Sequence, residues 1–285
     1  QNKINADKTI YQSMFDRSKV DSLEGLACIN YANKDIKRAI QQHKILLLLS
    51  TNNATFHFQL ACLYFSQGKF DKGFVHHSYR KKINNCHGDF IPAPQLKSLD
   101  EINKSKVLIY AEGGNGDMFQ YVRYIKLLKE LGAITFLMPR AENSNKILSL
   151  CPYVDFVVKN NLKNVFEVDF KIRLFDLLEL FKTTINSIPR NVPYLYADNK
   201  LVEHWKKTIK TNKKPKIGIY YKSSHFIGSI FLELSLSCRS IPQNTILSLT
   251  QNEGFDFYLL QKNCIEPLGK INTFRNDFDV LNGAF

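Results

Sequence analysis

The chain has 285 residues, of which 44% are hydrophobic and 23% charged, and its formal net charge is +13. This length predicts about two domains, and the apolar fraction is that of globular proteins, which excludes wholesale disorder. The basic excess favours anionic partners. It is scattered as single lysines and pairs such as Lys206-Lys207 and Lys213-Lys214, without a long basic run. We therefore expect no nucleic-acid partner.

The longest apolar run, Ile45 to Leu49, is far shorter than the roughly 20 residues of a membrane span, so no membrane span is expected. Six cysteines lie far apart without a C-x-x-C pair, which argues against a disulfide framework and against a zinc site. We expect reduced thiols, no metal, no cofactor and a cytoplasmic location. Because the chain starts at Gln1 and ends at Phe285 within an apolar stretch, we also expect it to be a piece of a longer protein.

The first 87 residues contain a repeat with an offset of 34, which aligns residues 20–53 with residues 54–87. The matching positions are Leu26-Ala27-Cys28-Ile29 with Leu60-Ala61-Cys62-Leu63, Ile36 with Phe70, Ala39 with Gly73 and His43 with His77. Small residues at fixed spacing suit two packed helices, and the period resembles the tetratricopeptide repeat. The first copy has Lys34 where the second has its turn glycine. Such arrays need about three units, so the helices should continue upstream or pack on the next domain.

Two histidines close the second copy, His76 and His77. Adjacent helical residues point about 100° apart, so they are poorly placed to share a metal ion. We expect both on the surface of the repeat helices.

Beyond a loop-like linker at 88–104, strands alternate with helices, which predicts a parallel sheet. The expected strands are Lys106–Tyr110, Ile134–Met138, Val154–Val158 and Val168–Ile172, and the expected helices are Met118–Leu131, Glu142–Leu150 and Leu174–Phe181. A polar helix should follow at 198–211. A second strand series then opens with Lys216–Tyr221 and Asp256–Leu260, and only about half a Rossmann-type domain remains for it.

The first strand is followed by the glycine turn Gly113-Gly114-Asn115-Gly116-Asp117 and then by a helix. This arrangement predicts a site for an anionic or polar ligand. Phe119 stands where a dinucleotide-binding turn needs its third glycine, and no Gly-Lys-Ser/Thr follows, which disfavours the familiar dinucleotide and ATP modes. Asp117 has two interpretations. It is a helix N-cap, or it is a general base at the carboxyl end of a parallel strand.

The segment from Val107 to Tyr124 resembles a family signature, E-x-G-x-G-D-x-x-Q-x-x-R-Y. The matching residues are Glu112, Gly114, Gly116, Asp117, Gln120, Arg123 and Tyr124. This signature is similar to that of bacterial tetratricopeptide-repeat proteins with a family-nine glycosyltransferase domain, which are heptosyltransferase-like and have the two-Rossmann GT-B fold. Weaker matches follow in the family's order at 151–155, 188–195, 216–219, 239–242 and 260–262.

The resemblance implies an α/β fold of GT-B type. Its expected parts are tetratricopeptide-like hairpins at 1–87, a linker at 88–104, a Rossmann-like acceptor domain at 105–211 and an incomplete donor domain at 212–285.

The same resemblance implies an inverting transfer from a nucleotide-sugar, acting as co-substrate, to a glycan or protein acceptor. No metal is required. Asp117 would be the general base, on an acceptor loop that comprises Glu112, Gly114, Asn115, Gly116 and Gln120. Arg239 and Lys262 would lie near the donor phosphates.

Two departures keep an alternative open. The family's donor loop is missing from this chain, and residues 223–238 are apolar where the family is rich in Asn and Arg. The alternative is a non-catalytic scaffold that binds a protein partner through its repeats. Glu112 likewise has two interpretations, a second catalytic carboxylate or a residue that orients the turn.

Overall fold

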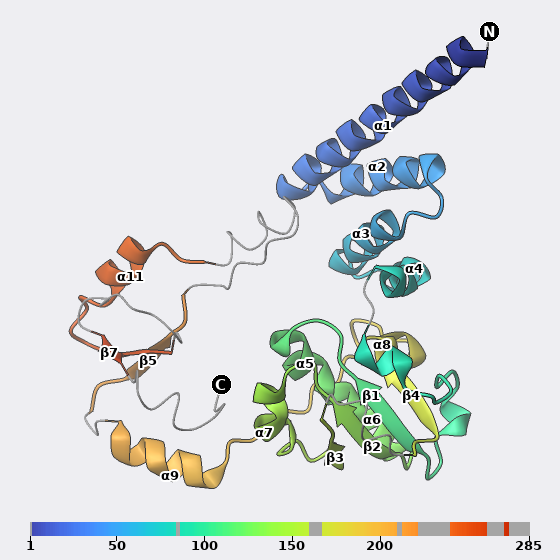
Figure 1. Ribbon diagram of the computed structural model, residues 1–285. Coiled ribbons are helices and arrows are strands. Elements are labelled where there is room, and N and C mark those ends of the chain that lie inside the picture. The colour runs from blue at the N-terminus through green and yellow to red at the C-terminus, as the bar shows by residue number, and fades with distance from the viewer. Residues whose placement is uncertain are drawn as a thin grey trace. The chain divides into compact units, whose positions relative to one another are not determined.

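The computed structural model describes residues 2–83, 86–159, 167–209, 213–221, 240–260 and 271–273 (Figure 1). The chain forms two compact units. One comprises Gln1–Arg140 and Pro152–Tyr194, and the other comprises Ala141–Cys151 and Leu195–Phe285.

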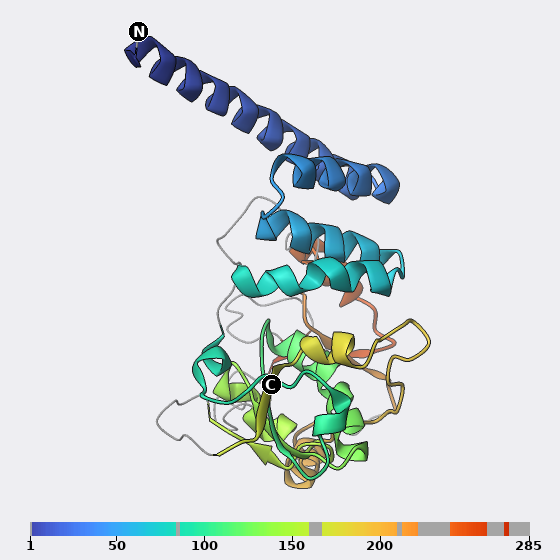
Figure 2. The same cartoon turned by 90° about the vertical axis from the view of Figure 1, so that its right-hand side faces the viewer.

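The first unit begins with four helices that pack side by side in chain order (Figures 1 and 2). They are α1 (Asn2–Ala32), α2 (Ile36–Leu49), α3 (Ala54–Ser66) and α4 (Phe70–His77), and a 3-10 helix, η1 (Ser78–Lys82), follows directly. Side-chain oxygens of Asp35 and Asn53 accept hydrogen bonds from backbone N–H groups in the first turns of α2 and α3. These caps set where the two helices begin.

The backbone repeats with the 34-residue offset of the sequence. The N–H of Asp35 donates to the carbonyl of Asn30 at 2.8 Å, and at the equivalent turn the N–H of Lys69 donates to Tyr64 at 2.9 Å. Lys34 takes a left-handed conformation, with φ of 63°, to match the 68° of Gly68. The small residues at the helix crossings are all buried, namely Ala27, Ala39, Ala61 and Gly73. The two helix pairs are therefore two copies of one unit.

A four-stranded parallel sheet with the order β3-β2-β1-β4 follows, as the alternation of strands and helices predicts. Its strands are β1 (Lys106–Tyr110), β2 (Ile134–Met138), β3 (Phe156–Val157) and β4 (Phe170–Arg173). The first two have the expected bounds, whereas β3 is shorter than expected and β4 begins two residues later and ends one residue later than expected. The last four residues of β1 are buried, and the strand lies between β2 and β4.

The helices that follow the strands of this sheet are short. They are α5 (Asn115–Tyr121), η4 (Val122–Tyr124), α6 (Ile125–Glu130) and α8 (Asp176–Leu180). One continuous helix was expected at 118–131, but the 3-10 turn of η4 divides it. The segment expected as a linker contains η2 (His87–Phe90) and η3 (Leu99–Glu101), and Gln95 pairs with Lys171 beside β4. Leu96 and Ile102 in this segment are buried, so it packs onto the sheet.

The second unit contains a three-stranded parallel sheet with the order β5-β6-β7. Its elements are η5 (Glu142–Ser144), α7 (Asn145–Leu148), α9 (Asn199–Thr208), β5 (Lys216–Ile219), α11 (Gln243–Leu249), β6 (Asp256–Leu259) and β7 (Asn272–Thr273). A small core forms from Ile219, Tyr221, Ile246, Phe257 and Leu259. Both strands expected for the second series are present. Among the described helices, none combines the length and apolar character needed to cross a membrane.

Candidate functional site

The strand order points to one place on the first sheet. The chain runs from β1 outward to β2 and β3, and then returns to the other side of β1 as β4. In doubly wound sheets, ligands bind outside the carboxyl ends of the strands where the order reverses. Here that place lies between the ends of β1 and β4. The loop after β1 carries the glycine turn, and the residues that end and follow β4 carry Arg173 and Asp176.

The glycine turn has the geometry that its sequence requires. Gly113 has a φ of 82°, and a Cβ on this residue would lie 2.5 Å from Oδ2 of Asp117. Gly114, not Asp117, is the N-cap of α5, and Asp117 is three residues further on. The Asp117 carboxylate reaches back and accepts a hydrogen bond from the N–H of Gly114 at 2.9 Å. The interpretation of Asp117 as the N-cap is therefore wrong, although its side chain does stabilise the turn, and the carboxylate remains exposed.

The other acceptor-loop residues lie on the same turn and helix. Asn115 is half-buried, and Gly116 and Gln120 are exposed. Arg123 donates to the carbonyl of Gln120 at 2.7 Å and to the hydroxyl of Tyr194 at 2.6 Å, and its guanidinium lies over the Tyr194 ring. This arginine therefore joins the helix of the turn to the segment near residue 194.

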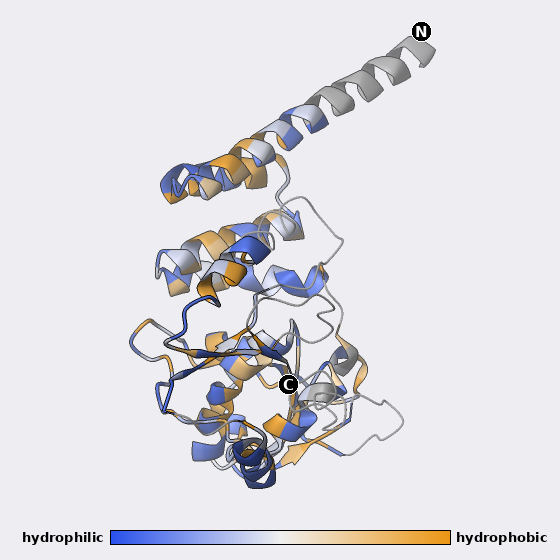
Figure 3. Cartoon of the chain, turned by 90° about the vertical axis from the view of Figure 1, so that its left-hand side faces the viewer, coloured by the Kyte–Doolittle hydropathy of each residue, from blue (hydrophilic) through white to orange (hydrophobic). Residues whose placement is uncertain are grey.

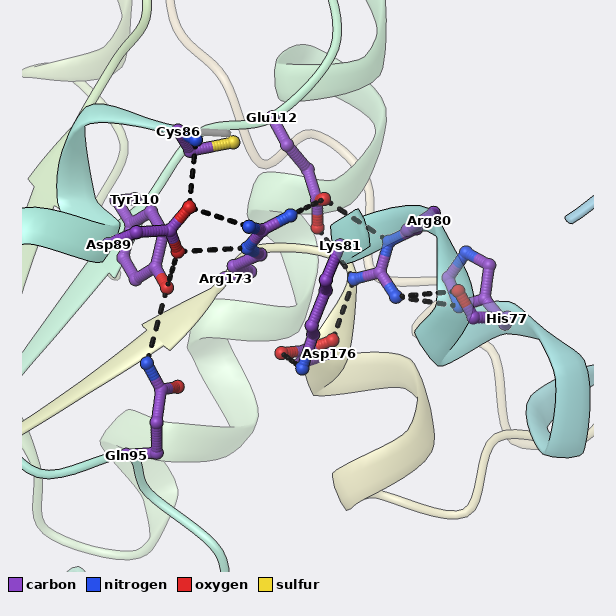
Figure 4. Close-up of polar contacts among 10 residues, drawn as sticks. All are labelled: His77, Arg80, Lys81, Cys86, Asp89, Gln95, Tyr110, Glu112, Arg173 and Asp176. Carbon is purple, nitrogen blue, oxygen red and sulfur yellow. Dashed lines mark hydrogen bonds and ion pairs between the residues drawn. The ribbon is translucent and has the colours of Figure 1, made fainter. Parts of the chain in front are cut away.

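Glu112 is held in a buried ion-pair network (Figure 4). Arg80 from η1 binds its carboxylate with two bonds, Nη2 to Oε1 at 2.7 Å and Nε to Oε2 at 3.1 Å. Arg173 at the end of β4 donates a further bond to Oε2 at 3.3 Å. The Arg80 and Glu112 side chains are 5% and 8% exposed, so these contacts are shielded from water. With both oxygens engaged, Glu112 is placed to orient the turn.

Arg80 makes five hydrogen bonds, which equals the number of N–H donors of a guanidinium group. Besides Glu112, it donates through Nη2 to Asp176 at 2.6 Å and through Nη1 to the carbonyl and the Nδ1 atom of His77. It thus connects the second repeat, the end of β1 and the start of α8.

Arg173 makes a second two-bond pair, with Asp89 in η2. Burial alone would raise the pKa of Asp89, but hydrogen bonds from the backbone N–H of Cys86 and from Arg173 bring that pKa below its ordinary value. Tyr110 also donates to Asp89, at 2.8 Å.

The charges of the network balance. Its three carboxylates face three cations, and these residues are Asp89, Glu112, Asp176, Arg80, Lys81 and Arg173. Each of these cations faces a carboxylate, so the network is a fixed part of the protein.

His77 is buried, at 7% exposed, and the expectation of a surface position is wrong for it. Rings of Phe65, Phe74 and Phe175 surround it. Burial, and then the charge of Arg80, lower the pKa of His77 to about 3. The residue is therefore neutral and able to accept the Arg80 bond. The 34-residue repeat aligns His77 with His43, and this alignment is the sequence signal that could have indicated a structural position. Both histidines are buried.

The expected donor-side residues Arg239 and Lys262 lie outside the described residues, as does the apolar segment 223–238. Within the described residues, no group of three or more His, Cys, Asp or Glu side chains could hold a metal ion.

Sequence reasoning did not select Arg80, Asp89, Arg173 or Asp176 as site residues. Arg173 directly follows an expected strand and Asp176 lies in the first turn of the helix expected after it, and charged residues at the carboxyl ends of parallel strands are a usable signal. Arg80 carries no such signal, because it lies 32 residues from Glu112 on a different kind of element.

No model of a known protein family matches the chain, and no curated protein matches it significantly. Among solved structures, the chain is similar to a mutant of the O-GlcNAc transferase of Thermobaculum terrenum, with 10% sequence identity and a TM-score of 0.23. The match covers 55% of this chain and 37% of that one, so the chain spans well under half the length of that protein. A TM-score this low carries no weight for fold or function.

Proposed function

We propose that this chain belongs to an inverting glycosyltransferase that transfers a sugar from a nucleotide-sugar donor to a hydroxyl acceptor, with Asp117 as its general base. The observation that carries the proposal is the position of Asp117. Its carboxylate is exposed beside the carboxyl end of β1, where the strand order reverses, and is held by the N–H of Gly114. Ligands of such sheets bind at this place. The resemblance of the 112–124 segment to the glycosyltransferase signature supports the same role.

In the proposed reaction, Asp117 takes the proton of an acceptor hydroxyl as its oxygen attacks the anomeric carbon of the donor sugar. The bond from that carbon to the diphosphate oxygen breaks on the opposite side, so the configuration inverts and a nucleoside diphosphate leaves. Glu112, Gly114, Asn115, Gly116 and Gln120 shape the acceptor loop. Arg239 and Lys262 are proposed to contact the donor phosphates, and residues 105–211 and 212–285 are proposed as acceptor and donor domains.

The test is to incubate the purified protein with a panel of UDP- and GDP-sugars and to measure the release of the nucleoside diphosphate. Turnover of at least one donor is expected, and it should increase when a glycan or protein acceptor is added. If the protein neither turns over nor binds any donor of the panel, the proposal fails.

A scaffold that binds a protein partner is the second candidate. Apolar side chains of the repeat helices are exposed, and orange segments mark apolar residues in the coloured parts of α1 and α2 in Figure 3. Among the residues of these helices whose exposure the structure describes, Leu48 is 79% exposed, and Leu26, Ile29, Ile45 and Leu49 are also exposed. Exposed apolar patches are typical of interaction surfaces. A binding partner recovered in the absence of any donor turnover would favour this function.

A further inference from the structure

The pair between Arg80 and Glu112 joins the helical repeats to the residue that precedes the glycine turn. Arg80 follows the last helix of the second repeat, and Glu112 immediately precedes Gly113. Two parallel bonds fix a carboxylate in both direction and distance, which a single bond does not. The position of Glu112 therefore follows that of Arg80.

Arg80 is itself fixed from the repeat side. His77 accepts from its Nη1 atom, and the ring of His77 lies among aromatic side chains of α3 and α4. Asp176 at the start of α8 binds the remaining N–H of Nη2. The guanidinium is thus held in one orientation by both the repeats and the sheet.

From Glu112 the constraint passes along the backbone. Gly113 takes a positive φ directly after Glu112, and Gly114 then donates to the Asp117 carboxylate. A shift of Glu112 moves the start of this turn, and the Asp117 carboxylate moves with it. Through this pair, Arg80 is a point at which the repeats act on the turn.

We propose that Arg80 is a positioning residue for the turn that carries Asp117, so that the repeats set the geometry of the candidate catalytic carboxylate. The description of the turn as catalytic rests on the proposed function. The coupling of Arg80 to the turn does not, because it is a property of the folded chain alone.

The experiment compares Arg80→Lys with the wild type by amide hydrogen exchange. Lysine keeps the positive charge but cannot form the two parallel bonds to Glu112. We expect the protected amides of Gly114 and Met118 in the turn to exchange at least about tenfold faster, while those of β2 are unchanged. The matched control is Lys81→Met, which removes a charge from the same network but contacts Asp176 and not Glu112. It should leave exchange in the turn unchanged.

Faster exchange of the turn and of β2 alike would overturn the proposal, since that result is the signature of a general loss of stability. Unchanged exchange in the turn of a folded Arg80→Lys protein would overturn it as well. If this variant does not fold, the double variant Arg80→Met with Glu112→Met decides, because it leaves no unpaired buried charge between these two residues. In this double variant we expect faster amide exchange in the turn and unchanged exchange in β2. A turn that is as protected as that of the wild type contradicts the proposal.

A kinetic readout separates this inference from the function. With an active donor in hand, Arg80→Lys should lower kcat by about 10- to 100-fold with little change in KM, because Asp117 is misplaced and the substrate contacts remain. If no donor is turned over but exchange in the turn increases, the positioning role stands and the proposed function fails. If turnover is found and exchange in the turn does not change, the reverse holds.

Discussion

The Asp117 carboxylate accepts the N–H of Gly114 at 2.9 Å through Oδ2, and this bond closes the first turn of α5. Its other oxygen, Oδ1, makes no hydrogen bond with any residue in the part of the chain that the structure describes. One oxygen is thus used to fix the side chain, while the other is free to accept a proton from a ligand.

Replacing Asp117 with Asn tests this division. The amide oxygen can still accept from Gly114, but the side chain can no longer take a proton, so transfer should fall by about 10²- to 10⁴-fold. The measurement is release of nucleoside diphosphate from a donor that the wild type uses. Asp71→Asn is the matched control, because Asp71 is an exposed acidic residue in the first turn of α4. Full activity of Asp117→Asn would disprove the base assignment.

Glu112→Gln should destabilise the fold strongly. The change removes the negative charge that Arg80 and Arg173 share while both arginines stay buried. Breaking a buried ion pair in this way lowers the free energy of unfolding by about 3–5 kcal/mol. Urea unfolding measures the loss. For comparison, Glu130→Gln removes an exposed pair with Lys126, and it should change stability by less than about 1 kcal/mol. Equal effects of the two substitutions would mean that the buried network adds little.

His77 should make stability depend on pH. Its pKa is about 3 when folded, because burial and the charge of Arg80 oppose protonation, against 6.5 in the unfolded chain. Below pH 6.5 this histidine binds a proton in the unfolded state but not in the folded state. The free energy of unfolding is therefore highest above pH 6.5 and falls as the pH decreases toward 3. Between pH 7.5 and pH 5.5 the loss is about 1.4 kcal/mol.

Chemical unfolding at these two pH values checks this dependence. His77→Phe should remove most of the difference between them, since phenylalanine suits the aromatic surroundings and binds no proton. His204→Phe, at an exposed position of α9, should retain it. A dependence that survives His77→Phe in full would assign the effect to other groups.

Lys34→Gly should stabilise the repeats. Lys34 holds a φ of 63°, and the left-handed region costs a residue with a Cβ about 1 kcal/mol that glycine avoids. Lys37→Gly is the comparison, because glycine inside a helix such as α2 is unfavourable, and it should lower stability by about 1 kcal/mol. Thermal unfolding of the two variants should therefore shift in opposite directions. A lower Tm for Lys34→Gly would contradict the turn geometry.

Gly73→Ala probes the crossing of α3 and α4. An added Cβ would overlap the ring of Phe65, which is packed against other aromatic side chains, so about 1–3 kcal/mol of stability should be lost. Gly25→Ala makes the same change in α1, where nothing lies within 4 Å, and it should be neutral or stabilising by up to about 1 kcal/mol. Equal behaviour of both variants would show that the helix crossing tolerates a larger residue.

Much of the local structure could be predicted from the residues. The bounds of β1 and β2 follow from short apolar runs, the parallel sheet from the alternation of strands with helices, and the two repeat units from the 34-residue spacing. The glycine turn could also be predicted, because a positive φ such as that of Gly113 favours a residue without a Cβ. The shortened β3 and the divided α5–α6 segment were not readable, because pairing and packing at the edge of the sheet decide where such elements stop.

The sequence by itself determined the repeats, the sheet and the turn that carries Asp117, because these depend on spacing along the chain. The tertiary structure decided that Arg80, Glu112, Arg173 and Asp176 form one buried network, and that His77 is interior and neutral. No local pattern joins residues 32 to 96 positions apart. Only the packing of the repeats on the sheet removes water from these charges, and that exclusion makes their pairing strong enough to fix the turn.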